Sequence, residues 1–236
     1  MRGRKVRSEV AVRQMGTKGG HKEVFAHDED EGDGAHAQQV LQGGLVTHHH
    51  VAGDGVEQHF KDPNESAAAG IACVYQELNI EKLLSITDNI FINKWLKKGK
   101  LLDYPAMHKK AKEVMASLGQ DVDPTKPAGN FGMGVQQMIE IAKAVLINAK
   151  MIIMDEPTSS LGEKEVEQLM KTCRDLKARG IGIVFVSHKL EELFELCDRV
   201  TVIRDGEYIE TRDISGWDND SLITAMVGRS LDNQFP

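Results

Sequence analysis

Residues 151–157 read MIIMDEP, and the chain continues with TSSL. Four apolar residues run directly into Asp155 and Glu156, and such a short apolar run predicts a strand buried on both faces of a sheet. Two adjacent carboxylates at the end of a buried strand are typical of a site that handles a metal-bound phosphate. The stretch therefore predicts a parallel sheet with a phosphate site at its edge.

Apolar runs and amphipathic runs alternate on both sides of this strand. Further strands are predicted at 71–75, 181–186, 199–203 and 207–211, the last two joined by the turn Asp205-Gly206. Helices are predicted at 105–118 with Asp103 as N-cap, at 136–148, at 164–178, from about 190, and at 219–227. Continuous apolar strands that alternate with helices indicate an α/β fold, a mostly parallel sheet with flanking helices.

The composition bounds the class of protein. The 236 residues, 41% of them apolar, suffice for one large domain or two small ones. The net charge of −7 argues against nucleic acid as a partner. The three cysteines are widely spaced, which predicts reduced thiols in the cytosol. No apolar run approaches the roughly 20 residues that span a membrane.

The first 58 residues differ in composition from the rest. Residues 1–60 hold seven of the nine histidines and ten of the 22 glycines, with few large apolar side chains. Such a segment buries too little surface to offset its ordering entropy, so 1–58 is predicted to be disordered or ill-packed. HHH at 48–50, with His36 and His59, is a possible transition-metal site, although a solvated polar loop is the favoured interpretation.

Polar residues follow two of the predicted strands. Asp155 and Glu156 end one strand, and Ser187-His188 end the strand VFV. If these strands are neighbours, the carboxylates and the imidazole meet at one edge of the sheet. That set suits phosphoryl transfer: one carboxylate holds Mg²⁺ through water, the other orients the attacking water, and His188 donates to the transferred phosphoryl group. A lone histidine is more often structural, but this placement favours function.

Two weaker features fit the same site. Gln76 follows the strand 71–75, where its amide is suited to ligate a metal ion or the attacking water. The stretch NFGMGVQQMIEIAKA carries Gly132 and Gly134 into a helix, whose free N–H groups and positive dipole end favour an anion. Either feature alone is a weak signal.

Together, and in this order, these pieces resemble the ATP-binding cassette of ABC transporters. VYQELN (74–79) is similar to the family's Q-loop, FGMGVQQM (131–138) to its LSGGQ signature, MIIMDEP to its Walker B strand, SSLGEKE (159–165) to its D-loop and VSHKLEE (186–192) to its H-loop. QQMIEIAKAV and the ending MVGRSLDNQFP are similar to the first cassette of double-cassette ATPases that power monosaccharide import, of the galactose/methyl-galactoside or ribose type. The resemblance covers about residues 60–236.

The resemblance implies roles for particular residues. Glu156 would polarise the attacking water and His188 would sense the γ-phosphate of ATP. Asp155 and Gln76 would hold Mg²⁺ through water, and Gln76 would link the metal to the membrane subunit. The positions that it assigns to nucleotide binding are Gln76, Gly132, Gly134, Gln136 and Asp155. It also implies a cassette at 59–236, with a helical subdomain at about 79–147.

A phosphate loop should precede Gln76, and the sequence lacks one. The pattern G-x-x-x-x-G-K-[ST], whose backbone amides and lysine cradle the β- and γ-phosphates, begins at no glycine between Gly3 and Gly70. GTKGG at 16–20 has no following Gly-Lys-Ser/Thr. Nor does the segment show an adenine-stacking aromatic residue or the antiparallel strands with which a cassette begins. A disrupted reading frame or gene model explains this better than a divergent amino terminus.

The signature and the D-loop also depart from the family pattern. Gly132 and Phe131 stand where the family has Ser and Leu. The missing hydroxyl removes a hydrogen bond to a charged group, worth roughly 1.5–3 kcal/mol, while Gly134 keeps its backbone contact. Gly162 stands where the D-loop often has Asp or Thr, which loosens that loop.

Three functions remain open from the sequence. The first is the ATPase subunit of a monosaccharide importer, in an incomplete or misread copy. The second is a degenerate cassette that lends its signature helix to ATP held by a partner. The third is a cassette ATPase outside transport. The first implies membrane permease subunits, a second cassette and, indirectly, a periplasmic or extracellular sugar receptor, with the chain in the cytoplasm on the inner face of the membrane.

Overall fold

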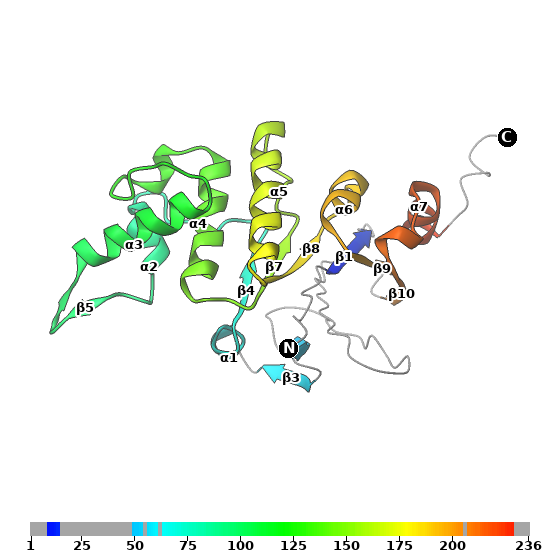
Figure 1. The fold of residues 1–236 in the computed structure, drawn as a ribbon, viewed down its shortest axis with the longest axis horizontal. Coiled ribbons are helices and arrows are strands. Elements are labelled where there is room, and N and C mark those ends of the chain that lie inside the picture. Colours follow the sequence, from blue (N-terminus) through cyan, green and yellow to red (C-terminus); the bar gives the residue numbers. More distant parts are fainter. Residues whose placement is uncertain (1–8, 15–48, 54–55, 61–62, 205–206, 229–236) are drawn as a thin grey trace.

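The computed structural model describes residues 9–14, 49–53, 56–60, 63–204 and 207–228 (Figure 1). The six-stranded sheet has the strand order β10-β9-β1-β8-β7-β4. Its strands are β1 (Glu9–Gln14), β4 (Ile71–Val74), β7 (Met151–Asp155), β8 (Gly182–Val186), β9 (Arg199–Arg204) and β10 (Glu207–Asp213). Neighbouring strands run parallel except at the edge, where β10 pairs with β9 antiparallel. The predicted α/β fold with a mostly parallel sheet is confirmed.

Helices flank the sheet and extend the molecule to one side of it (Figure 1). They are α1 (Pro63–Ala68), α2 (Ile86–Phe91), α3 (Tyr104–Ser117), α4 (Met133–Leu146), α5 (Glu163–Ala178), α6 (Leu190–Leu196) and α7 (Asn219–Val227). Two short antiparallel hairpins complete the described elements, β2 (His49–Gly53) with β3 (Val56–Phe60) and β5 (Lys97–Lys98) with β6 (Leu101–Leu102). Of the helices in the described ranges, none has the length and apolarity needed to cross a bilayer.

Helix α4 connects the helical part of the molecule to the sheet. It contacts α2 and α3 on one side and β4 and α5 on the other. Met138 and Ile141 of α4 belong to one apolar core with Met154 of β7, Met107 of α3 and Leu169 of α5. Because this core is continuous, α4 holds its amino terminus in a fixed place relative to the sheet. The range 79–147 contains α2, α3, α4 and the β5–β6 hairpin.

Local sequence explains where the helices begin. Asp103, the predicted N-cap, accepts a hydrogen bond from the Ala106 N–H at 3.1 Å, as a capping carboxylate does. In the same way Asp218 accepts from the Ser221 N–H at 2.7 Å at the start of α7, and Gly228 ends that helix at φ 76°.

The structure departs from the expectation for residues 1–58 at two places. EVAVRQ forms β1, which pairs with β9 over all six residues from Glu9 to Gln14. The alternation of Val10 and Val12 is a strand pattern that the composition of the whole segment obscured. His49–Gly53 also forms a strand, and with β3 it gives an antiparallel hairpin that the sequence did not predict. Residues 1–8 and 15–48, with His36, lie outside the described part, and the boundary at residue 58 stays a prediction.

Candidate functional site

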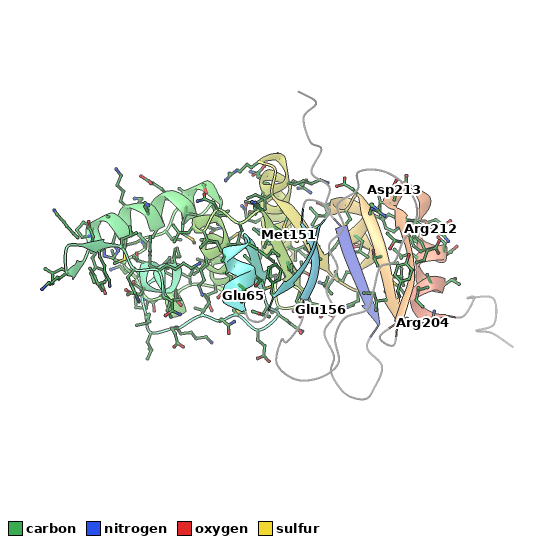
Figure 2. The ribbon with its side chains drawn as sticks, turned by 90° about the horizontal axis from the view of Figure 1, so that it is seen from below. Glu65, Met151, Glu156, Arg204, Arg212 and Asp213 are labelled. Carbon is green, nitrogen blue, oxygen red and sulfur yellow. The ribbon has the colours of Figure 1, made fainter. Side chains whose placement is uncertain are left out.

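Three adjacent parallel strands bring the predicted polar residues to one edge of the sheet. Met154 of β7 pairs with Val74 of β4 on one side, and Asp155 pairs with Val186 of β8 on the other. Gln76, Glu156 and His188 each follow one of these strands by one or two residues. The neighbour relation between β7 and β8 on which the site prediction depended is therefore present. Figure 2 labels Met151, the first residue of β7, and Glu156, which directly follows the last residue of that strand.

Glu156 and His188 contact each other directly. The Nδ1 atom of His188 lies 3.2 Å from Oε1 of Glu156. The Glu156 side chain is 14% exposed, whereas that of His188 is 56% exposed. The Glu156 carboxylate is therefore the more buried member of the pair, and the His188 imidazole lies on its solvent side. A base that is oriented by a second side chain is the arrangement that proton abstraction from water requires.

The backbone of Glu156 is unusual. Its φ is +43°, in the left-handed region that non-glycine residues seldom occupy. Its N–H donates to the Val186 carbonyl at 2.9 Å, which continues the ladder between β7 and β8 by one residue. The chain therefore turns sharply just after the sheet ends, and this turn aims Glu156 toward His188. Such strain costs on the order of 1–3 kcal/mol and persists where surrounding structure enforces it.

A partly buried network of polar side chains supports the segment that carries His188. The Ser187 hydroxyl donates to Oε2 of Glu192 at 2.9 Å and accepts from the Lys189 N–H at 3.1 Å. Lys189 Nζ donates to the carbonyl and the hydroxyl of Thr158, at 3.3 and 3.1 Å. Thr158 lies in the loop that follows Glu156, so these bonds join the two strand ends. Sequence reasoning missed Lys189, Glu192 and Thr158, although a glutamate four residues after His188, about one helical turn away, was an available signal.

Asp155 lies beside a thiol on the neighbouring strand. Burial and, to a smaller extent, the negative charge of Asp155 raise the pKa of Cys73 to about 11. The Cys73 thiol is therefore protonated at neutral pH and does not act as a nucleophile or a metal ligand there. Burial and the proximity of Cys73 also raise the pKa of Tyr75.

The donors at this edge suit magnesium rather than a softer metal. Asp155 and Gln76 offer a carboxylate and an amide oxygen, ligands that Mg²⁺ takes together with waters and substrate phosphates. Among the side chains that the structure describes, no group of three or more His, Cys, Asp or Glu residues could hold a metal by itself.

The predicted signature residues stand at the amino terminus of α4. Gly132 is the N-cap and carries no side-chain capping bond, and Gly134 lies in the first turn. The Gly134 N–H donates to Oε1 of Glu165 at 3.0 Å. Gln136 is buried, and its Nε2 donates to the Phe131 carbonyl at 2.8 Å. The Gly134 amide is therefore already bonded to a carboxylate, and the Gln136 side chain is engaged within its own turn.

Comparison with known proteins gives a family match over half of the chain. The family model described as ABC transporter matches residues 39–159. This match begins inside the segment 1–58 and ends just after the carboxylates that follow β7.

Curated relatives are sugar-import proteins. The galactose/methyl galactoside import ATP-binding protein of Salmonella typhimurium is 46% identical over 77% of this chain and 36% of its own length. The Escherichia coli protein of the same name is 47% identical with the same coverage. The ribose import ATP-binding protein of Halalkalibacterium halodurans is 45% identical over 77% of this chain and 37% of its length. The chain thus spans a little over a third of the length of these relatives.

Solved structures show the same fold. An ATP-binding cassette of an ABC transporter in its ADP conformation matches with a TM-score of 0.62 at 21% identity, covering 75% of each chain. A nucleotide-free ATP-binding cassette from an ABC transporter matches with a TM-score of 0.60 at 21% identity, covering 75% of this chain and 72% of that one. At 21% identity, these matches support a shared fold and nothing beyond it.

Proposed function

Because this chain belongs to the ABC transporter family, we propose that it is part of an ATP-binding cassette from the ATP-binding subunit of a monosaccharide importer. The observation that carries the proposal is the contact between Glu156 and His188 at adjacent strand ends, 3.2 Å apart. The similarity to galactoside and ribose import proteins supports the substrate class. Which of these sugars is imported is a property of other subunits.

In this proposal the strand-end residues act on the water that attacks ATP. Glu156 accepts a hydrogen bond from that water and takes its proton, while His188 holds the carboxylate in place through Nδ1. The His188 side chain is 56% exposed, and in this proposal it would contact the γ-phosphate of ATP. The turn at Glu156 fixes the direction of the carboxylate before any nucleotide arrives, so little reorganisation is needed during reaction.

Magnesium is the metal ion that fits the donors. Asp155 and Gln76 would hold it, directly or through water, on the β4 side of Glu156. The ion would supply charge neutralisation for the phosphate oxygens.

The phosphates themselves need a loop that this sequence does not contain. No G-x-x-x-x-G-K-[ST] pattern occurs in the 236 residues. We therefore propose that the chain by itself binds ATP weakly and hydrolyses it negligibly. In the importer setting it would sit on permease subunits at the inner face of the membrane and pair with a second cassette.

The missing phosphate loop also suggests a second candidate function. ABC cassettes pair so that each nucleotide lies between the phosphate loop of one cassette and the signature of the other, as the family resemblance implies. A phosphate bound at Gly134 would have to replace Oε1 of Glu165 as the acceptor of its N–H, but the chain retains Gly132 and Gly134 at the amino terminus of α4. It could therefore complete an ATP site whose phosphate loop belongs to a partner, even without hydrolysis at its own strand ends.

One experiment separates the two roles. ATP binding and hydrolysis are measured for a loop-bearing sugar-import cassette with and without this chain, using Glu156→Gln and Gly132→Asp as variants and Glu167→Gln as the control on an exposed position. If the chain only contributes its signature helix to the partner's ATP site, the unsubstituted chain stimulates the partner's ATP hydrolysis. Gly132→Asp then abolishes that stimulation, and Glu156→Gln leaves it intact. If its own strand ends hydrolyse ATP, Glu156→Gln lowers the rate by about 10²–10⁴-fold. If the unsubstituted chain does not stimulate ATP binding or hydrolysis by the loop-bearing cassette, the partner role is contradicted.

A further inference from the structure

One carboxylate links two helix termini that are distant in the sequence. Oε1 of Glu165 accepts from the Gly134 N–H at 3.0 Å, and Oε2 accepts from the Gly162 N–H at 3.1 Å. Gly134 lies in the first turn of α4, and Gly162 is the N-cap of α5. Amides in the first turn of a helix have no intrahelical acceptor, so each depends on an outside partner. A single side chain supplies that partner to both helices.

The glycines around Glu165 explain how the carboxylate reaches both amides. A Cβ atom at Gly134 would lie 2.8 Å from Oε1, 2.9 Å from Cγ and 3.0 Å from Cδ of Glu165, closer than Cβ atoms approach other atoms. A Cβ atom at Gly132 would lie 3.5 Å from Oε1, an ordinary contact. The bridge therefore requires glycine at 134 and tolerates a side chain at 132. Gly162 has no side chain that could accept from the Glu165 N–H. Of the two bonds of a capping box, only the one from the Gly162 N–H to the Glu165 carboxylate therefore forms.

The loop on the other side of this bridge carries the strand-end carboxylate. Residues 156–162 run from Glu156 to Gly162, and the loop is braced internally by the Ser159 N–H to the Glu156 carbonyl and the Leu161 N–H to the Thr158 carbonyl, both 3.2 Å. Lys189 holds Thr158 from the side of His188. A continuous path of contacts thus runs from His188 through this loop to Glu165 and Gly134.

We propose that Glu165 is a positioning residue: its carboxylate ties the first turn of α4 to the loop 156–162 and so sets where the Gly134 amide stands relative to Glu156. The bridge itself depends on no nucleotide, whereas its consequence for a bound nucleotide rests on the proposed function. In that setting the tie makes the helix terminus and the strand-end carboxylate shift together.

Amide hydrogen exchange of the whole chain, followed residue by residue without nucleotide, tests the tie. Glu165→Ala is compared with Glu163→Ala, because both glutamates lie in the first turn of α5 and both substitutions remove the same favourable charge from that helix. Glu165→Ala should speed exchange at Gly134 and Gly162 together by at least about tenfold, while Glu163→Ala leaves both unchanged. Glu165→Gln, which keeps one acceptor oxygen, should release only one of the two amides.

Two results would overturn the proposal. One is unchanged protection of Gly134 and Gly162 in Glu165→Ala. The other is a uniform rise of exchange through the cores of α4 and α5, which would mean that Glu165 contributes general stability rather than a local tie. Neither result bears on ATP binding, so failure here is separate from failure of the proposed function.

Discussion

Glu156 combines a rare backbone conformation with a position next to His188. Its φ of +43° and its 3.2 Å contact with Nδ1 of His188 belong to one local arrangement, in which the turn after β7 points the carboxylate at the imidazole. The sequence showed that Glu156 follows a strand, but it gave no signal for the positive φ. A residue that could relieve the strain, such as glycine, would lose the carboxylate. The chemistry proposed for the site therefore keeps a strained residue in place.

The strain at Glu156 is measurable by comparing two substitutions that both remove the carboxylate. Glu156→Gly permits a positive φ at no steric cost, whereas Glu156→Ala retains the Cβ atom that makes it unfavourable. We expect the glycine variant to have a free energy of unfolding about 1 kcal/mol higher than the alanine variant, measured by urea denaturation. Equal stability of the two variants would mean that the backbone at 156 is unstrained.

Gly132 is a second residue where a substitution should be informative. Gly132 has φ −64° and ψ 167°, which serine adopts readily, and a Cβ atom there meets only Oε1 of Glu165 at 3.5 Å. Gly132→Ser supplies an N-cap hydroxyl to α4, so it should stabilise the fold by a few tenths of a kcal/mol. It should also strengthen ATP binding at a site shared with a loop-bearing cassette by about tenfold.

Titration of ATP into the mixed cassettes measures that change at Gly132, and Gly132→Ala serves as the matched control because it adds a Cβ without a hydroxyl. If serine and alanine behave alike, the hydroxyl contributes nothing to nucleotide binding.

Helices and strands with a strong hydrophobic period were predictable, and short or glycine-led elements were not. The predicted helix at 164–178 differs from α5 by one residue, and 219–227 coincides with α7. Helix α4 begins three residues before the predicted 136, because Gly132 and Met133 gave no capping signal. Helix α2 was missed because six residues are too few for a period to show. The strand β1 was missed because its six residues lie in a segment of different composition.

The cap of α3 offers a test at the scale of one element. Asp103 accepts from the Ala106 N–H at 3.1 Å and starts a 14-residue helix whose buried face carries Met107, Ala111 and Met115. Asp103→Ala should lower the free energy of unfolding by about 1 kcal/mol, read from urea denaturation. Asp103→Asn keeps an oxygen acceptor and should cost much less; a loss as large as that of alanine would show that the charge, not the capping bond, matters.

At the scale of the whole molecule, buried thiols make stability depend on alkaline pH. Burial raises the pKa of Cys73 to about 11 and that of Cys173 to about 12, and it raises the pKa of Cys197 as well. In the unfolded chain these thiols ionise near pH 9, so above that pH the folded state holds protons that the unfolded state has released. Stability is therefore full below about pH 9 and falls as pH rises through the folded pKa values.

The free energy of unfolding, measured in urea at about pH 8 and about pH 10.5 under reducing conditions, should be lower at the higher pH. Cys73→Ala removes one of the three thiols and should make the decline shallower. A free energy of unfolding that stays level or rises over this range would mean that the thiols ionise as readily in the folded chain as in the unfolded one.

The chain combines neighbouring strand ends that carry the predicted site residues with a sequence that lacks a phosphate loop. The sequence located Gln76, Asp155, Glu156 and His188 correctly at the carboxyl ends of neighbouring strands, because parallel topology fixes that edge. It did not reveal the supporting contacts of Lys189 and Glu165, which join segments that only the folded chain brings together. The strand-end site that we propose and the binding of the phosphates are therefore tested separately.

Equilibrium binding of ATP with Mg²⁺ to the chain alone, by isothermal titration, tests this separation most directly. The chain, folded by circular dichroism, should show a dissociation constant weaker than about 1 mM, because no loop in its sequence cradles the β- and γ-phosphates. Saturable binding in the micromolar range by the chain alone would contradict the account, since another part of the molecule would then be holding the phosphates.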